Sequence, residues 1–184
     1  MRKHLLLIIL FTVQFSLSSQ AQSLSLATLI AMQKGGLSAT TNILRTKGWR
    51  FRGELGSSRS SEACAFPEIG WEYPASSPNH YPLAKAELYK YGSDCSYTVS
   101  YRTASIEAYN SIRASALKRG MKLARTRVVK SIANDSGKIP DGTGIQEIYQ
   151  SSTLEVGLII SADPNSSGQI ENTYHFRVSN KQKY

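Results

Sequence analysis

The sequence predicts an α+β fold of two tandem units, each a helix followed by four antiparallel strands, with the helices packed on one face of the sheet. Three observations lead to this prediction. Two helical stretches each end in a basic residue and a glycine, in "KGWRF" from Lys47 and "RGMKL" from Arg119. After each glycine the apolar spacing changes from about 3.6 residues to 2. Segments rich in Gly, Ser, Pro and Asn then separate the alternating runs.

The first 21 residues have the layout of a secretory signal peptide. Arg2, Lys3 and His4 precede an apolar run from Leu5 to Leu17, and small residues follow at positions 19 and 21. This order of basic, apolar and small residues is typical of a cleaved signal. The run is shorter than the roughly 18 apolar residues of a membrane-spanning helix. We therefore expect an exported chain, periplasmic or secreted, that begins at Gln22 and has no transmembrane segment.

The first unit is predicted over residues 22–104 and begins with an interrupted helix. Apolar residues fall at helical spacing from Leu26 to Met32, and the paired glycines Gly35 and Gly36 then break the pattern. A second short helix is expected to end at Gly48, a residue type suited to the left-handed position after a helix. Four strands follow in sequence as a meander, in the runs "WRF", "EIGWEY", "KAELYKY" and "CSYTVSYRT".

The second unit is predicted over residues 105–184. Ser105 is placed to cap a helix with one apolar stripe through Ile106, Tyr109 and Ile112, which Gly120 ends. Alternating runs start at Met121, "IQEIYQS", "TLEVGLIIS" and "NTYHFRVSN". The two units together form one domain of ordinary size.

Cys64 and Cys95 are the two cysteines of the chain. An even count in an exported protein favours a disulfide over two buried thiols, a metal pair or a catalytic nucleophile. In a simple meander, however, the strands that follow Cys64 and Cys95 lie about 9.6 Å apart, whereas a disulfide needs Cα atoms within about 7 Å. The bond therefore requires the segment around Cys64 to fold over the strand end.

Charge and aromatic residues suggest a binding surface. The formal net charge is +9, with basic residues dense between Arg113 and Lys130. This pattern fits an anionic partner, although a solvated basic surface gives the same pattern. The expected export argues against nucleic acid as that partner.

Tyr89 and Tyr91 lie on the opposite side of their strand from Leu88, so we expect both to be exposed. The candidate surface thus comprises Tyr89, Tyr91, Arg125 and Arg127, with cross-strand core packing as the alternative for the tyrosines.

The sequence offers little material for catalysis, and it predicts no catalytic, cofactor-binding or metal-binding residue. The chain lacks the common metalloprotease, serine hydrolase and phosphate-loop motifs. His80 lies in a predicted loop, and His175 is predicted to point away from Tyr174 and Phe176. The segment "NDSGKIPDGTG", from Asn134, has its acidic residues too sparsely placed for a calcium loop and is typical of a hairpin turn.

The repeated order of helix, "KGWRF", strands, helix, "RGMKL", strands, ending in "VSNKQKY", resembles a family of uncharacterised exported bacterial proteins. The layout is also loosely similar to the architecture of β-lactamase inhibitor proteins, a resemblance that raises the expectation of a binding surface but does not imply function. We expect an exported, non-enzymatic binding or envelope-associated protein whose partner is a protein or a surface glycan. The alternatives are a carbohydrate or anionic-polymer binder, and a hydrolase using His80, His175, Asp141 and the cysteines.

Overall fold

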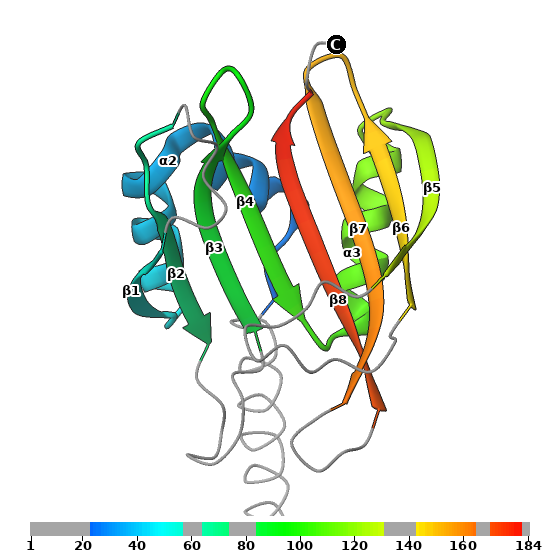
Figure 1. The fold of residues 1–184 in the computed structure, drawn as a ribbon, viewed down its shortest axis with the longest axis horizontal. Helices are drawn as coiled ribbons and strands as arrows, with labels where there is room; N and C mark the ends of the chain where they lie inside the picture. The colour runs from blue at the N-terminus through cyan, green and yellow to red at the C-terminus, as the bar shows by residue number, and fades with distance from the viewer. Residues whose placement is uncertain (1–22, 57–63, 74–83, 131–142, 165–169, 182–184) are drawn as a thin grey trace, which may run out of the picture.

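The computed structural model describes residues 23–56, 64–73, 84–130, 143–164 and 170–181. Within them the chain forms two helices and eight strands, in an order that alternates one helix with four strands (Figure 1). Their bounds are α2 Leu26–Thr46, β1 Arg50–Gly56, β2 Glu68–Tyr73, β3 Ala84–Tyr91, β4 Ser96–Thr103, α3 Ile106–Lys118, β5 Lys122–Lys130, β6 Thr143–Gln150, β7 Leu154–Pro164 and β8 Ile170–Asn180. The mixed α and β composition that the sequence predicts is confirmed, with most of the structure in strands.

The strands form one antiparallel sheet in the order β1-β2-β3-β4-β8-β7-β6-β5. Strands β1 to β4 pair in sequence order, as the predicted meander requires. Strands β5 to β8 do the same, so β4 and β8 meet at the centre and β1 and β5 form the two edges. The sequence patterns predict neighbours within each run of strands, but the pairing of β4 with β8 joins segments more than seventy residues apart.

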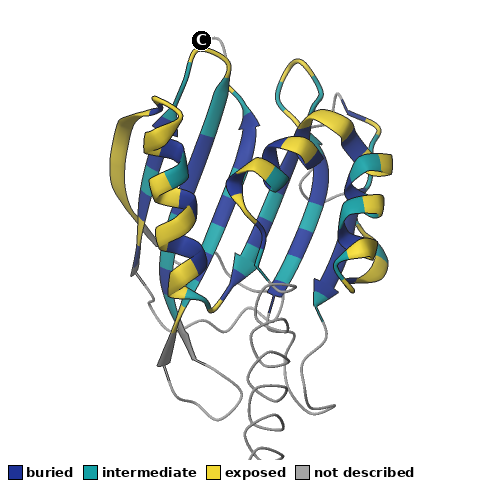
Figure 2. Ribbon diagram, turned by 180° about the vertical axis from the view of Figure 1, so that it is seen from behind, coloured by how far each residue is buried: buried dark blue, intermediate teal, exposed yellow. Residues whose placement is uncertain are grey.

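Both helices lie on the same face of the sheet (Figures 1 and 2), which confirms that part of the fold prediction. Directly opposite residues of antiparallel strands point to the same side, so rows of side chains run across the sheet. One row under the helices is apolar throughout its central part and completely buried: Trp71, Ala86, Tyr101, Phe176 and Leu158. This row and its neighbours form the hydrophobic core with the inner sides of α2 and α3. The predicted core positions Tyr97, Val99 and Tyr101 belong to it or pack against it.

The predicted interruption of the first helix is a kink rather than a break. Ser25 caps the N-terminus of α2, and Gly36 takes non-helical angles (φ 63°, ψ −149°) in the middle of the helix. A side chain at position 36 would collide with the ring of Tyr97, so the kink also lets α2 approach β4 closely. The end of the helix matches the prediction, because Gly48 is left-handed with φ 77°.

The two helix ends share one hydrogen-bond pattern. The N–H of Gly48 donates to Arg45 O and that of Trp49 to Leu44 O, while Gly120 and Met121 donate in the same way to Leu117 O and Ala116 O. This is the Schellman arrangement, which uses a left-handed residue to satisfy the last carbonyls of a helix. Gly120 has φ 74°. Each helix therefore turns directly into the first strand of the set that follows it.

Both edge strands carry an irregularity at the same distance from these glycines. In β1 the pairing shifts between Phe51 and Gly53, and in β5 it shifts between Leu123 and Arg125. β1 has a second shift between Glu54 and Gly56, whereas β5 pairs regularly with β6 from Arg125 to Lys130.

No helix in the described part of the chain has the length and apolar character needed to cross a membrane.

Candidate functional site

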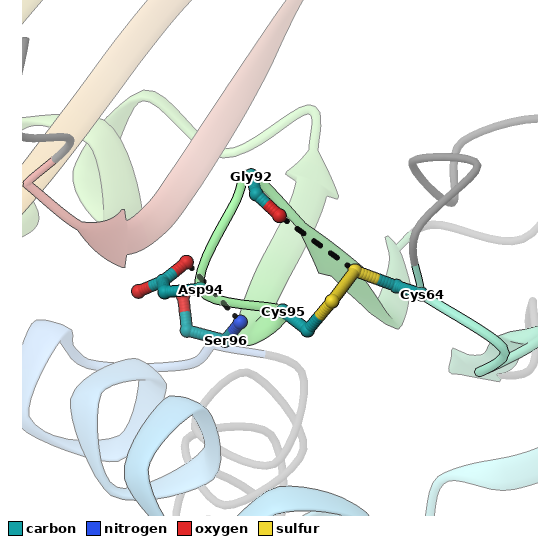
Figure 3. Close-up of a disulfide and its surroundings, with 5 residues drawn as sticks. All are labelled: Cys64, Gly92, Asp94, Cys95 and Ser96. Carbon is teal, nitrogen blue, oxygen red and sulfur yellow. Dashed lines mark hydrogen bonds between the residues drawn. A yellow bond between two sulfur atoms is a disulfide. The ribbon is translucent and has the colours of Figure 1, made fainter.

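Cys64 and Cys95 form a disulfide, as the sequence predicts, with their Cα atoms 5.5 Å apart (Figure 3). Cys95 ends the turn between β3 and β4 and has a positive φ of 48°, which is uncommon for a residue other than glycine. Cys64 precedes β2, and its Sγ is 3.7 Å from the carbonyl oxygen of Gly92. The segment before β2 therefore crosses to the β3–β4 turn, the route that the sequence required. The bond excludes both cysteines as metal ligands or nucleophiles.

The sheet side opposite α2 and α3, here named the polar face, carries a second set of rows. The longest row starts at the β1 edge and ends at the β5 edge, and most of its members are charged or polar: Arg50, Glu72, Lys85, Arg102, His175, Ile159, Gln146 and Arg127. His175 lies on the opposite side from Tyr174 and Phe176, as predicted. The polar face is therefore built by the same alternation that builds the core.

The β1 end of this row is occupied by an ion-pair group. Glu72 is 8% exposed and accepts hydrogen bonds from Arg50, while its other carboxylate oxygen is 3.3 Å from Nε of Arg52. Two cations thus share one buried carboxylate, which keeps β1 attached to β2 beyond the backbone ladder. The group retains one net positive charge.

Lys85 and Arg102 come next in the row and are directly opposite one another on β3 and β4. Like charges in this position repel and reduce the stability of a sheet. Partial burial lowers the pKa of the Lys85 ammonium below its usual range, and the charges of Arg102 and Arg52 lower it further. The carboxylates of Glu87 and of Glu72, which lies opposite Lys85 on β2, oppose this shift but do not cancel it. The arrangement favours an anion beside Lys85 and Arg102, because an anion would offset both the repulsion and the loss of hydration.

Arg177 joins the centre of the polar face to its aromatic end. Its guanidinium lies over the ring of Tyr91, 4.7 Å from the centroid, and reaches there across β4. Nε of Arg177 and the hydroxyl oxygens of Thr98 and Ser96 are buried and have no hydrogen-bond partner within the described structure. Buried polar atoms normally have a partner. All three atoms lie on β4 and β8, near the exposed Tyr91.

The four residues of the candidate surface do not form one patch. Tyr89 and Tyr91 lie on β3, whereas Arg125 and Arg127 lie on β5, five strand spacings or about 24 Å away. Tyr91 is 43% exposed, as expected, but the expectation for Tyr89 is wrong, because that residue is only 5% exposed. Tyr89 lies within β3, and Thr98, directly opposite, is itself buried.

A separate polar network links α3 to β6 on the helix side. Arg113 Nε donates to Glu147 Oε2 at 3.0 Å and to the Tyr149 hydroxyl at 2.9 Å. The Tyr149 hydroxyl donates to the same carboxylate, and the Tyr109 hydroxyl donates to it at 3.4 Å. Burial, together with the charge of Glu147, raises the pKa of Tyr109 to about 12. Every member has a partner within the network, which points to a structural role in holding α3.

Several sequence interpretations concern residues outside the described ranges. His80 and the loop with Asn134, Asp135 and Asp141 are among them. In the ranges that are described, no group of three or more His, Cys, Asp or Glu side chains is arranged to hold a metal ion.

Sequence reasoning did not select Lys85, Arg102, Arg177 or Thr98. A signal was present, since Lys85 alternates with Ala86, and Arg102 with Tyr101, which places both on the side away from the core. Lys85 and Arg102 are neighbours because of the register of β3 with β4, and Arg177 comes close to them because β4 pairs with β8.

Comparison of the chain with protein-family models, curated proteins and solved structures finds no match.

Proposed function

We propose that the protein is an exported, non-enzymatic binding protein, and that its ligand is an anionic polymer, most simply an acidic polysaccharide, bound on the polar face over β3, β4 and β8. The observation that carries the proposal is the combination of Lys85 and Arg102 in one cross-strand pair with Tyr91 and Arg177 further along the same face. Cations pair with acidic groups, and an exposed aromatic ring provides contact area at a small entropic cost.

A polymer suits this surface better than a small ion does. The cationic pair and Tyr91 lie at opposite ends of β3, so six residues of strand, or about 20 Å, separate them. Between them lie the hydroxyl group of Thr98 and the Nε of Arg177, and the hydroxyl group of Ser96 lies opposite Tyr91; these atoms have no partner in the described structure. The carboxylate of Glu87 lies on the same side of β3, between Lys85 and Tyr89, and has a partner of its own. A chain of sugar units carries hydroxyl groups that can pair with those three atoms and acidic groups that can pair with the cations. The net charge, +9 for the full sequence and +7 without Arg2 and Lys3 of the signal peptide, favours the same class of ligand.

Export is part of the proposal. The layout of residues 1–21 is that of a signal peptide. The Cys64–Cys95 disulfide supports it, because disulfides persist in oxidising compartments outside the cytoplasm. Mass spectrometry of the mature chain would test both parts, with an N-terminus at Gln22 and one intact disulfide as the expected result.

We also propose that the two halves, residues 22–104 and 105–184, are copies of one helix-plus-four-strand unit. The sheet order is consistent with this, since each half contributes four consecutive strands and the fourth strand of each lies at the centre. Further support comes from the shared Schellman bonds and from the pairing shifts three to five residues after Gly48 and Gly120. In this alignment Glu155 occupies the place of Lys85. Lys85 pairs with Glu72, the residue opposite Arg50, and Glu155 pairs with Gln150, the residue opposite Lys122. The cationic pair therefore belongs to the first half alone.

The hydrolase alternative has less support. Two of its proposed residues, Cys64 and Cys95, are held in the disulfide. His175 lies between Arg102 and Ile159 on the polar face, and His80 and Asp141 are outside the described residues.

Binding can be tested by affinity electrophoresis in gels that contain a polyuronate, a sulfated polysaccharide or a neutral glucan. The mature protein should be retarded by an acidic polymer but not by the neutral one. The double variant K85Q/R102Q should bind at least about tenfold more weakly, because one charge-assisted hydrogen bond contributes about 1.5–3 kcal/mol.

The matched control is K118Q/R119Q, which removes the same charge from exposed residues at the end of α3. It should retain nearly all of the affinity. Equal losses in the two double variants would show that net charge alone determines retardation, and the proposal for the polar face would then fail. The variant Y91A should weaken binding to polysaccharide without changing net charge.

A further inference from the structure

Strand β5 is exposed on both of its sides, as is the other edge strand, β1. It is an edge of the sheet, paired with β6 along one side only. The residues from Lys122 to Val128 are all exposed, and the strand is entirely yellow where it can be followed in Figure 2. An edge strand leaves backbone N–H and C=O groups available for pairing with another extended segment.

The two sides of β5 have different chemistry. On the polar face the strand presents Lys122, Arg125 and Arg127, which pair with Gln150, Ile148 and Gln146 respectively. On the helix side it presents Leu123 and Val128, with exposed fractions of 49% and 73%. Val128 continues a row through Ile145, itself 52% exposed, toward Ile160 and Tyr174 at the core. The strand is thus amphipathic, and it has basic but no acidic residues.

The opposite edge, β1, is also exposed on both sides, but it contains the acidic residue Glu54 and its pairing is irregular. β1 contains two pairing shifts, and both Gly53 and Gly56 have positive φ. Irregularities of this kind prevent an edge from pairing with a further strand. β5 has one shift, near its start, and is regular from Arg125 to Lys130, long enough for a short peptide to pair with it.

A second copy of the chain does not suit this edge. If two β5 strands paired in antiparallel fashion, Arg125 and Arg127 of one copy would lie opposite or diagonal to the same basic residues of the other. Like charges in these positions oppose association. An acidic segment would instead neutralise the basic side.

We propose that β5 binds an extended segment of a partner protein in which acidic and apolar residues alternate, and that this segment adds a ninth strand to the sheet. Main-chain hydrogen bonds to the free edge provide affinity. The acidic side chains pair with Lys122, Arg125 and Arg127, and the apolar side chains cover Leu123 and Val128. This inference does not depend on the polysaccharide proposal, because it concerns a different strand and a different class of partner.

The test uses an eight-residue peptide of alternating Glu and Val, titrated into the mature, disulfide-bonded protein and followed by two-dimensional NMR. Saturable shifts at the amides of β5, with slower hydrogen exchange along that strand, are the expected result. Two control peptides test charge and backbone pairing separately. A peptide of alternating Lys and Val reverses the charge, and a peptide of alternating Glu and Val methylated on alternate backbone nitrogens cannot form all of the main-chain hydrogen bonds. Each should bind at least tenfold more weakly. Equal binding of the methylated peptide would show that main-chain hydrogen bonds to β5 do not provide the affinity, and the proposal would fail.

A charge reversal makes the test independent of peptide composition. The variant R125E/R127E should lose affinity for the acidic peptide at least tenfold and bind the Lys and Val peptide in its place. The variant K118E/R119E makes the same change of charge on α3 and should behave as the wild type. Because Arg127 donates to Gln146 at 2.6 Å, the milder variant R125Q/R127Q serves if the reversal disturbs folding. Absence of saturable binding at β5, or an unchanged preference in the reversed variant, would overturn the proposal.

Discussion

Lys85 and Arg102 lie directly opposite one another on β3 and β4, on the sheet face opposite the core residues Ala86 and Tyr101. Two cations in this position reduce stability, and each can be replaced by an uncharged residue without affecting the core on the other side. Their arrangement is the kind of local conflict that proteins retain at functional sites.

The first prediction is that removing one charge stabilises the fold. Replacement of Lys85 by Met keeps the apolar stem and removes a charge whose burial and repulsion by Arg102 and Arg52 outweigh its attraction to Glu87 and Glu72. The free energy of unfolding should therefore rise by about 0.2–1 kcal/mol. Urea denaturation measures the change, with Lys118→Met on α3 as the control that should have an effect near zero. A loss of more than about 1 kcal/mol in the Lys85 variant would mean that Lys85 is a structural residue.

The second prediction concerns the disulfide. Replacing Cys64 and Cys95 together by Ser should lower the free energy of unfolding by about 3–4 kcal/mol, because the bond closes a loop of moderate length in the unfolded chain. Denaturation of the oxidised wild type and the double variant gives the difference.

The positive φ of Cys95 supplies a control for that experiment. Glycine adopts φ 48° without strain, so the variant with Ser at 64 and Gly at 95 should be at least as stable as the double Ser variant. A less stable glycine variant would show that the turn conformation does not strain residue 95.

The third prediction compares two glycines with positive φ. Gly36→Ala should cost at least about 2 kcal/mol, because the new methyl group meets the Tyr97 ring and the backbone angles suit only glycine. Gly48→Ala should cost about 1 kcal/mol, because its φ of 77° is unfavourable for alanine but no atom lies within 4 Å of the new Cβ. Thermal unfolding of both variants tests the order, and equal losses would remove the argument that α2 is kinked to fit Tyr97.

The fourth prediction is an alkaline loss of stability that depends on Tyr109. Its pKa rises from 10.0 to about 12 in the folded state, so between these values the folded state holds a proton that the unfolded state has lost. The contribution of Tyr109 is therefore complete below pH 10 and declines as the pH rises through 12, by up to about 1.4 kcal/mol for each pH unit.

Tyr109→Phe should flatten this part of the pH profile. The comparison uses denaturation at several pH values between 9 and 12, with ultraviolet titration of the phenol as a direct check. A Phe variant with an unchanged alkaline slope would mean that another group is responsible; burial raises the pKa of Tyr149 as well, which makes Tyr149→Phe the next variant to measure.

Local patterns predicted the two sides of most strands. Alternation placed Tyr97, Val99 and Tyr101 in the core and His175 away from it, and glycine chemistry placed the left-handed residue at Gly48. These properties depend on neighbours within a few residues. The disulfide was also predictable, from the cysteine count and the expectation of export, although its geometry required the chain to cross a strand end.

The candidate site was less accessible to sequence reasoning because it depends on long-range pairing. Tyr89 and Tyr91 alternate identically, yet only Tyr91 is exposed, since Tyr91 ends its strand and Tyr89 has neighbours on both sides. Arg177 reaches Tyr91 only because β8 lies next to β4, more than seventy residues earlier. Composition indicated a basic protein with many tyrosines, but register decided which cations and which rings meet.

The central claim is that the polar face over β3, β4 and β8 binds an acidic polymer. NMR titration of the isotope-labelled mature protein with a short polyuronate, at low and at high salt, tests this claim most directly. The account predicts saturable shifts around Lys85, Arg102, Arg177 and Tyr91 that weaken as salt screens the charges, with α2 and α3 unchanged. Shifts confined to the helices, or none at all at low salt, would contradict it.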